Sequence, residues 1–138
     1  MSRSLQAKAI VDGAACGTVL ALDEPLSFWG GVDPATGVIV DRHHPQANAS
    51  VAGTVLVLPG TRGSAGGSGT LAECLRLGTG PAAIVLPSAN RSVVVGVLVA
   101  DELHGRPVPV LVVPGDAHAS FRTGEVVTIA TGGRITRS

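Results

Sequence analysis

Short apolar runs rich in valine alternate with glycine and proline along most of the chain. Such runs, bounded by turn-forming residues, are typical of β-strands. One run contains Pro109, which favours either an edge strand or the start of a strand, because proline has no amide hydrogen to donate to a neighbouring strand. The pattern predicts strands at residues 7–11, 17–22, 38–40, 54–58, 82–86, 108–113 and 124–130.

Two other segments fit helices. In residues 68–77 the apolar side chains fall on one stripe, and Ser68 or Gly69 can serve as the N-cap. The second helix begins at Ser92 and stops at Gly105. Its valine-rich start also fits a strand, and we interpret it as a helix because a helix there completes a β-α-β order with the strand that follows.

The order of these elements predicts an α/β fold: a compact, three-layer or barrel-like β/α domain. With 138 residues the chain is long enough for one domain with its own hydrophobic core, and we expect residues 1–138 to form a single domain. Hydrophobic residues make up 45% of the sequence and charged residues 14%, which excludes a disordered chain. No apolar run approaches the length of about 20 residues that crosses a bilayer.

The charge balance argues against nucleic-acid binding. Ten basic residues meet ten acidic ones, so the formal net charge is +0 and there is no basic excess to contact phosphates. Two Phe, one Trp and no Tyr cannot build a platform for stacked bases. The low charge and high apolar content indicate instead that a protein partner covers part of the surface.

The two cysteines, Cys16 and Cys74, lie in no C-x-x-C motif or Cys/His cluster. We interpret them as buried free thiols in a reducing cytoplasm, and no residue of this chain is predicted to bind a metal. The first six residues contain no apolar run that would indicate export, so the predicted location is cytoplasmic.

The first unusual loop, residues 23–37, holds the aromatic pair Phe28 and Trp29, followed by Gly30 and Gly31. Such a loop either folds its aromatic side chains onto its own core or contacts a partner or lines a cleft. The adjacent histidines at 43 and 44 precede Pro45. They are candidates for contact with the same cleft, although a plain surface turn has the same residues.

The second unusual loop, residues 58–70, follows the clearest strand and opens a helix. Backbone amides at the start of a helix favour anions, and Arg62 can grip a carboxylate or phosphate in a bidentate way. Ser64 lies between the small residues Gly63 and Ala65, which leaves its hydroxyl open to approach. The spacing fits neither a phosphate-binding Walker loop nor a G-x-S-x-G nucleophile motif. We favour an anion site over a plain glycine turn.

These segments resemble one family. Residues 25–34 (Pro-Leu-Ser-Phe-Trp-Gly-Gly-Val-Asp-Pro), 41–45 (Asp-Arg-His-His-Pro) and 61–64 (Thr-Arg-Gly-Ser) are similar to the small subunit, or swivelling domain, of the aconitase X family. The resemblance extends from about residue 9 to residue 112. It implies a swivelling β/β/α domain and a separate large-subunit partner.

The resemblance also implies an activity. Aconitase-like hydro-lyases remove water from a hydroxy acid with the help of an iron–sulfur cluster or iron, which the large subunit would hold. By the same resemblance Ser64 is the catalytic base and Arg62, Gly63 and Ser68 bind substrate. The predicted enzyme is a dehydratase that is active only with its large subunit.

The implied substrate is the small hydroxy acid cis-3-hydroxy-L-proline, and mevalonate 5-phosphate is the alternative. A different class of function stays open as well. In that interpretation the chain is a non-catalytic docking module, the Phe28–Trp29 loop is its interface and Ser64 is only a helix cap.

Overall fold

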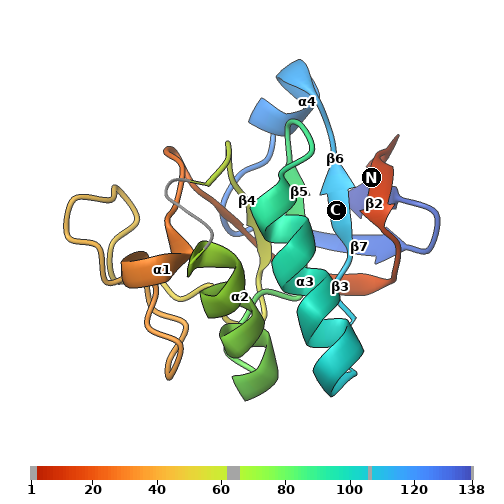
Figure 1. Ribbon diagram of the computed structural model, residues 1–138. Helices are drawn as coiled ribbons and strands as arrows, with labels where there is room; N and C mark the ends of the chain where they lie inside the picture. The colour runs from red at the N-terminus through yellow and green to blue at the C-terminus, as the bar shows by residue number, and fades with distance from the viewer. Residues whose placement is uncertain (1–2, 62–65, 106, 138) are drawn as a thin grey trace.

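The computed structural model describes residues 3–61, 66–105 and 107–137, and it has a mixed α/β fold (Figure 1). The described part of the chain has no helix long and apolar enough to cross a membrane. The strands are β1 (Arg3–Gln6), β2 (Lys8–Val11), β3 (Ala15–Ala21), β4 (Val55–Val57), β5 (Ala83–Leu86), β6 (Val110–Val112), β7 (Val126–Ala130) and β8 (Arg134–Arg137). The helices are α1 (Phe28–Gly31), α2 (Gly66–Leu77), α3 (Arg91–His104) and α4 (Gly115–Ala119).

All eight of these strands join in one sheet in the order β1-β8-β7-β3-β4-β5-β6-β2. Strands β3 to β6 run parallel to one another, and the pairings with β7, β8, β1 and β2 are antiparallel. The two edge strands, β1 and β2, are consecutive in the chain and separated only by Ala7. One extended segment therefore links both edges of the sheet, and the sheet curls into a near-barrel.

The parallel strands β4, β5 and β6 are buried on both faces, which explains their unbroken apolar sequences. On one face, Leu56 and Ile84 pack with the apolar side of the two long helices α2 and α3, which lie side by side over the sheet (Figure 1). On the other face, Val55 and Val85 pack against β7 and β8, including Ile135. The predicted α/β fold is thus confirmed: strands β7 and β8 form one layer, the parallel strands the middle layer, and helices α2 and α3 the third.

Several strand predictions need correction. Residues 38–40 form only isolated bridges, because Val38 and Ile39 each pair at a single position with a different segment. Strand β6 is an interior strand between β5 and β2, so the edge position suggested by Pro109 is wrong. The alternative holds, since Pro109 directly precedes the first residue of β6.

The helix predictions are right in place and wrong in their N-terminal caps. Helix α2 begins at Gly66, two residues before the cap predicted at Ser68. Helix α3 is capped by Asn90, whose side chain accepts a hydrogen bond from the Val93 amide, rather than by Ser92. Gly105 ends α3 in the left-handed conformation, with φ 61°, as predicted.

Candidate functional site

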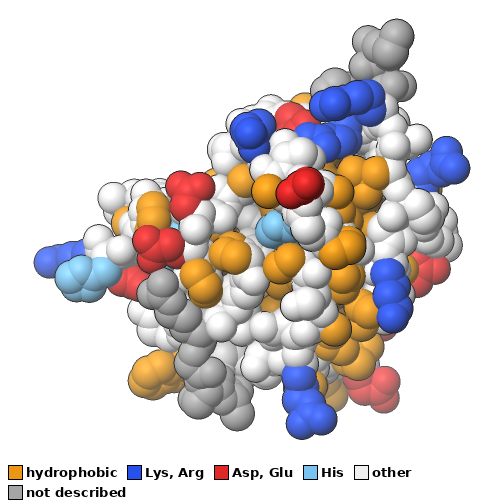
Figure 2. Space-filling model, turned by 90° about the horizontal axis from the view of Figure 1, so that it is seen from above, with side chains coloured by type: hydrophobic (Ala, Val, Ile, Leu, Met, Phe, Trp, Pro, Cys, Tyr) orange, Lys and Arg blue, Asp and Glu red, His pale blue; other side chains and the backbone are white. Residues whose placement is uncertain are grey.

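The four parallel strands all end at the same edge of the sheet, which Figure 1 shows at the top. In open parallel sheets, ligands bind at the carboxyl ends of the strands, where the loops converge. Here four segments meet at that edge: the loop after β3, residues 58–61 directly after β4 (the exit of β4), the N-terminal cap of α3 after β5, and α4 after β6. Figure 2 views the molecule from this side and shows hydrophobic side chains gathered across its middle.

The exit of β4 is tied to two neighbouring segments. The Leu26 amide donates to the carbonyl of Gly60 over 3.2 Å, and Leu26 forms a parallel bridge with Thr61. The side-chain amide of Asn90 donates to the Thr61 hydroxyl over 3.1 Å. The aromatic loop and the cap of α3 therefore meet at Thr61. Residues 62–65 follow directly, so the predicted site residues Arg62, Gly63 and Ser64 lie outside the described residues.

The aromatic pair divides between the core and the solvent. Phe28 is 2% exposed and belongs to the core between the sheet and the helices, whereas Trp29 is 68% exposed. The Ser27 hydroxyl donates to the Trp29 carbonyl over 2.8 Å, and Gly30 has a φ of 77°. Gly30 thus supplies a left-handed turn that other residues adopt at a cost. Phe28 thus fits the interpretation that the loop folds onto its own core, and contact of Trp29 with a partner or cleft stays a prediction.

The paired histidines also separate. His44 is 4% exposed: its Nδ1 accepts from the Gln46 amide over 3.0 Å, so Nε2 carries the hydrogen and donates to the Glu24 carbonyl over 3.2 Å. His43 is exposed. His44 therefore joins the Glu24 loop to the Gln46 turn, and its surroundings are those of a structural histidine.

Ser68, predicted to bind substrate, lies in the first turn of α2 and contacts α3. Its hydroxyl donates to the carbonyl of Ser92 in α3 over 2.9 Å. Its predicted contact with substrate stays a prediction.

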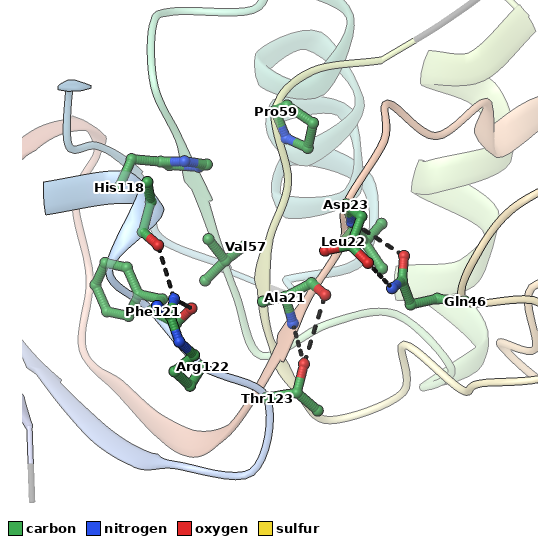
Figure 3. A pocket seen from close by; sticks show the side chains of 11 residues that line it. Ala21, Leu22, Asp23, Gln46, Val57, Pro59, His118, Phe121, Arg122 and Thr123 are labelled. Atoms are coloured by element: carbon green, nitrogen blue, oxygen red, sulfur yellow. Dashed lines mark hydrogen bonds between the residues drawn. The ribbon is translucent and has the colours of Figure 1, made fainter. Parts of the chain in front are cut away.

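A cleft of about 600 Å³ opens at the carboxyl edge (Figure 3). On one side the Gln46 side chain donates to the Asp23 carboxylate over 2.8 Å. Across the cleft, His118 and Phe121 line it from α4 and the turn that follows. Sequence reasoning did not find this cleft, because its walls come from four separate stretches of the chain, at 21–23, 46, 57–59 and 118–123. Its lining residues are Ala21, Leu22, Asp23, Gln46, Val57, Pro59, His118, Ala119, Phe121, Arg122 and Thr123.

Sequence reasoning also missed Asn90 and His118. Asn90 stands three residues before Val93 at the start of an apolar run, which is the usual spacing of an N-cap and was a usable signal. His118 sits on α4, a helix of only five residues with no apolar stripe, so nothing in the sequence marked it.

The cysteines lie apart, and one of the two predictions about them is wrong. Cys74 is buried, and burial raises the pKa of its thiol, but Cys16 on β3 is exposed. Within the described ranges, no group of three or more His, Cys, Asp or Glu side chains could hold a metal ion. The donor set of this part of the chain therefore does not fit an iron–sulfur cluster.

Comparison with known proteins identifies the class. The aconitase X swivel domain family matches residues 4–137, and the chain belongs to that family. It is 43% identical over 104 residues to a cis-3-hydroxy-L-proline dehydratase of Hypocrea jecorina, a match covering 75% of this chain and 17% of that protein. It is also 43% identical over 118 residues to the phosphomevalonate dehydratase small subunit of Methanopyrus kandleri, covering 85% and 83%.

The solved structures agree on the fold. The crystal structure of Thermococcus kodakaraensis aconitase X (holo-form) superposes with a TM-score of 0.86 at 31% identity, covering 99% of this chain and 98% of that one. The chain spans about a sixth of the length of the hydroxyproline dehydratases it matches, and most of the length of the phosphomevalonate dehydratase small subunits from Methanopyrus kandleri and Methanocella arvoryzae.

Proposed function

We propose that this chain is the small subunit of a two-subunit aconitase X-type hydro-lyase, which removes water from a small hydroxy acid together with a large subunit. The observation that carries this proposal is its membership of the swivel domain family, combined with a length close to that of named small subunits. The arrangement of the carboxyl edge supports it, because the exit of β4, the cap of α3 and α4 converge there.

In this proposal Ser64 is the general base. It comes three residues after Thr61, which Leu26 and Asn90 hold in place. The proposed base would therefore follow a segment whose position is fixed. A serine alkoxide needs nearby donors or a cation, and the amides at the start of α2 together with Arg62 are the groups that would supply them. Arg62 would bind the substrate carboxylate, with Gly63 allowing close approach.

The cofactor is proposed to belong to the large subunit. An iron–sulfur cluster or iron there would stabilise the negative charge that develops when a proton leaves the carbon beside a carboxylate. This chain's part would then be to bind and orient the substrate and to accept the proton.

The substrate that we propose is cis-3-hydroxy-L-proline, and its support is the match to named dehydratases of that compound in Hypocrea jecorina and Pseudomonas aeruginosa. Phosphomevalonate is the second candidate, and the near full-length match to archaeal small subunits favours it. Arg62 suits either compound, since a guanidinium binds carboxylate and phosphate alike.

The test is co-purification with an aconitase X-type large subunit, followed by assays of water loss from both compounds. Ser64→Ala should lower kcat by roughly 10²–10⁴-fold, the usual share of a positioned acid or base. Ser4→Ala, an exposed serine on β1, is the matched control and should leave kcat unchanged. Arg62→Lys should raise KM, because lysine keeps the charge and loses the planar fork.

Two results would contradict parts of this proposal. If Ser64→Ala keeps full turnover while Ser68→Ala loses it, the base is four residues further on. If both variants keep full turnover in an active complex, the chain acts as a non-catalytic docking module.

A further inference from the structure

The hydrogen-bond ladder between β4 and β5 lacks a donor at the candidate site. These strands pair in parallel with Val57 opposite Val85, and the Leu58 amide donates to the Val85 carbonyl over 3.2 Å. In a parallel ladder of this register the next bond runs from the amide of residue 87 to the Leu58 carbonyl. Residue 87 is proline and has no amide hydrogen.

This missing donor has a cost, because Leu58 is fully buried. A buried carbonyl without a partner loses its hydrogen bond to water and gains none in the protein. The chain leaves β4 at this point, three residues before Thr61. An unpaired Leu58 carbonyl would therefore loosen the sheet where the candidate site begins.

His118 supplies the donor. Its Nε2 lies 3.1 Å from the Leu58 carbonyl oxygen and 3.3 Å from the Val85 carbonyl oxygen. Both partners are acceptors only, so Nε2 must carry the hydrogen. His118, Val57 and Pro59 line the same cleft and are labelled in Figure 3.

An ionic network around Arg137 holds the turn that follows His118. Arg137 on β8 donates to the Ser120 hydroxyl over 2.8 Å and to the Glu125 carboxylate over 3.0 Å. Its guanidinium also stacks on the Phe121 ring, 4.4 Å from the ring centre. The turn directly after α4 is thereby held against β8, and this contact keeps the short helix α4, with His118, in one orientation.

We propose that His118 is a positioning residue: its Nε2–H replaces the amide that Pro87 lacks, and this bond fixes the exit of β4 at Leu58. The bond stands on the geometry alone, whereas its effect on turnover rests on the proposed function. With Thr61 held by Asn90, the exit is then anchored at both of its ends. A shift of about 1 Å in a catalytic group can cost on the order of 10²-fold in rate.

The test uses the co-purified complex and four variants of this chain. His118→Ala should lower kcat by roughly 10- to 100-fold and also raise KM, because the proposed base Ser64 and the proposed substrate ligand Arg62 both follow this exit in the sequence. His118→Gln should recover most of kcat, because the glutamine amide nitrogen reaches the place of Nε2. Pro87→Ala alone should be close to wild type. His118→Ala should also lower the melting temperature. In the double variant, Pro87→Ala should restore both kcat and the melting temperature, because it supplies the amide hydrogen that the ladder lacks.

A wild-type kcat in His118→Ala would overturn the proposal. So would a His118→Gln variant as slow as His118→Ala, since the imidazole would then act in some other way. Failure of Pro87→Ala to rescue kcat or the melting temperature of His118→Ala would also overturn it.

A second measurement separates this inference from the proposed function. In the ¹⁵N-labelled full chain, the ring nitrogen shifts of His118 should be those of a tautomer protonated at Nε2. A tautomer protonated only at Nδ1 would overturn the proposed bond. If the wild-type complex removes water from neither substrate, the proposed function fails while the tautomer and the rescue of melting temperature still decide the role of His118.

Discussion

His43 and His44 are neighbours in the sequence, and their surroundings in the fold are opposite. His44 satisfies the Gln46 amide and the Glu24 carbonyl while nearly fully buried, whereas His43 is exposed. We predict that His44→Ala lowers the free energy of unfolding by about 1–3 kcal/mol, because it leaves buried polar groups without partners. His43→Ala should change it by less than about 0.5 kcal/mol. Urea unfolding of both variants checks this, and equal effects would contradict it.

The two cysteines give a second prediction at this scale. Burial raises the pKa of the Cys74 thiol, so less of it is thiolate near neutral pH, and solvent does not reach it. Cys16 is exposed. A thiol reagent should therefore label one thiol per folded chain, at Cys16, and both in denaturant. Cys16→Ser should abolish labelling of the folded chain, and fast labelling of that variant would show that Cys74 is accessible.

At the residue scale, the sequence identified types of side chain better than their surroundings. Trp29 and Phe28 stood out by rarity, yet their rarity did not show that Phe28 would be buried in the core and Trp29 exposed to solvent. The proposed role of His118 on α4 depends on Pro87, which directly follows β5 and lies 31 positions away in the sequence. A pairing of that kind depends on the register of a parallel sheet, which local sequence does not encode.

The elements themselves were largely predictable. Buried parallel strands need apolar side chains on both faces, so β4 and β5 stand out as valine-rich runs. Strands β1 and β8 were missed because Arg3, Arg134 and Arg137 interrupt their apolar pattern. Helix α3 was ambiguous by propensity, and the stop at Gly105 pointed to the helix.

The packing of α2 on α3 gives the prediction at the element scale. A Cβ at Gly96 in α3 would lie 2.9 Å from the Ser68 carbonyl oxygen and 3.2 Å from Leu71 Cβ. Alanine gains about 1 kcal/mol in helix propensity, but overpacking against backbone costs typically about 1–3 kcal/mol. Because the obstructing atom belongs to the backbone of α2, we expect Gly96→Ala to be destabilising.

Gly69 is the matched control for that substitution. It lies in α2, and a Cβ there would meet no atom within 4 Å. Gly69→Ala should therefore stabilise the protein by about 0.5–1 kcal/mol. Thermal and urea unfolding of the two variants should give opposite signs, and stabilisation by Gly96→Ala would show that the helices can separate at no cost.

At the scale of the whole molecule, the carboxyl ends of the parallel strands β3 to β6 form the side of the near-barrel where the loops converge. Residue 7 joins β1 directly to β2, so the two outer strands of the sheet are held next to each other by the chain itself. The carboxyl edge instead gathers the aromatic loop, the exit of β4 and the cleft. This is the edge that the proposed large subunit would contact.

Trp29 supplies the prediction that belongs to this scale. It is the single tryptophan of the chain, it is 68% exposed, and its loop is tied to Thr61 through Leu26. Aromatic anchors often dominate the energetics of interfaces, so Trp29→Ala should weaken binding of the proposed large subunit by roughly 10-fold or more. The fold should be unaffected, because an exposed side chain contributes little to stability.

Phe28→Ala separates the two roles of the aromatic pair. Phe28 is a core residue, so this change should lower the free energy of unfolding by about 3–5 kcal/mol. Binding titrations of Trp29→Ala, paired with unfolding curves of both variants, test the division. The chain labelled with 5-fluorotryptophan adds a direct observation, because its single ¹⁹F signal should shift when the large subunit binds. If that signal stays in place and Trp29→Ala binds as tightly as wild type, the large subunit docks on another face, and the aromatic loop lies outside the interface.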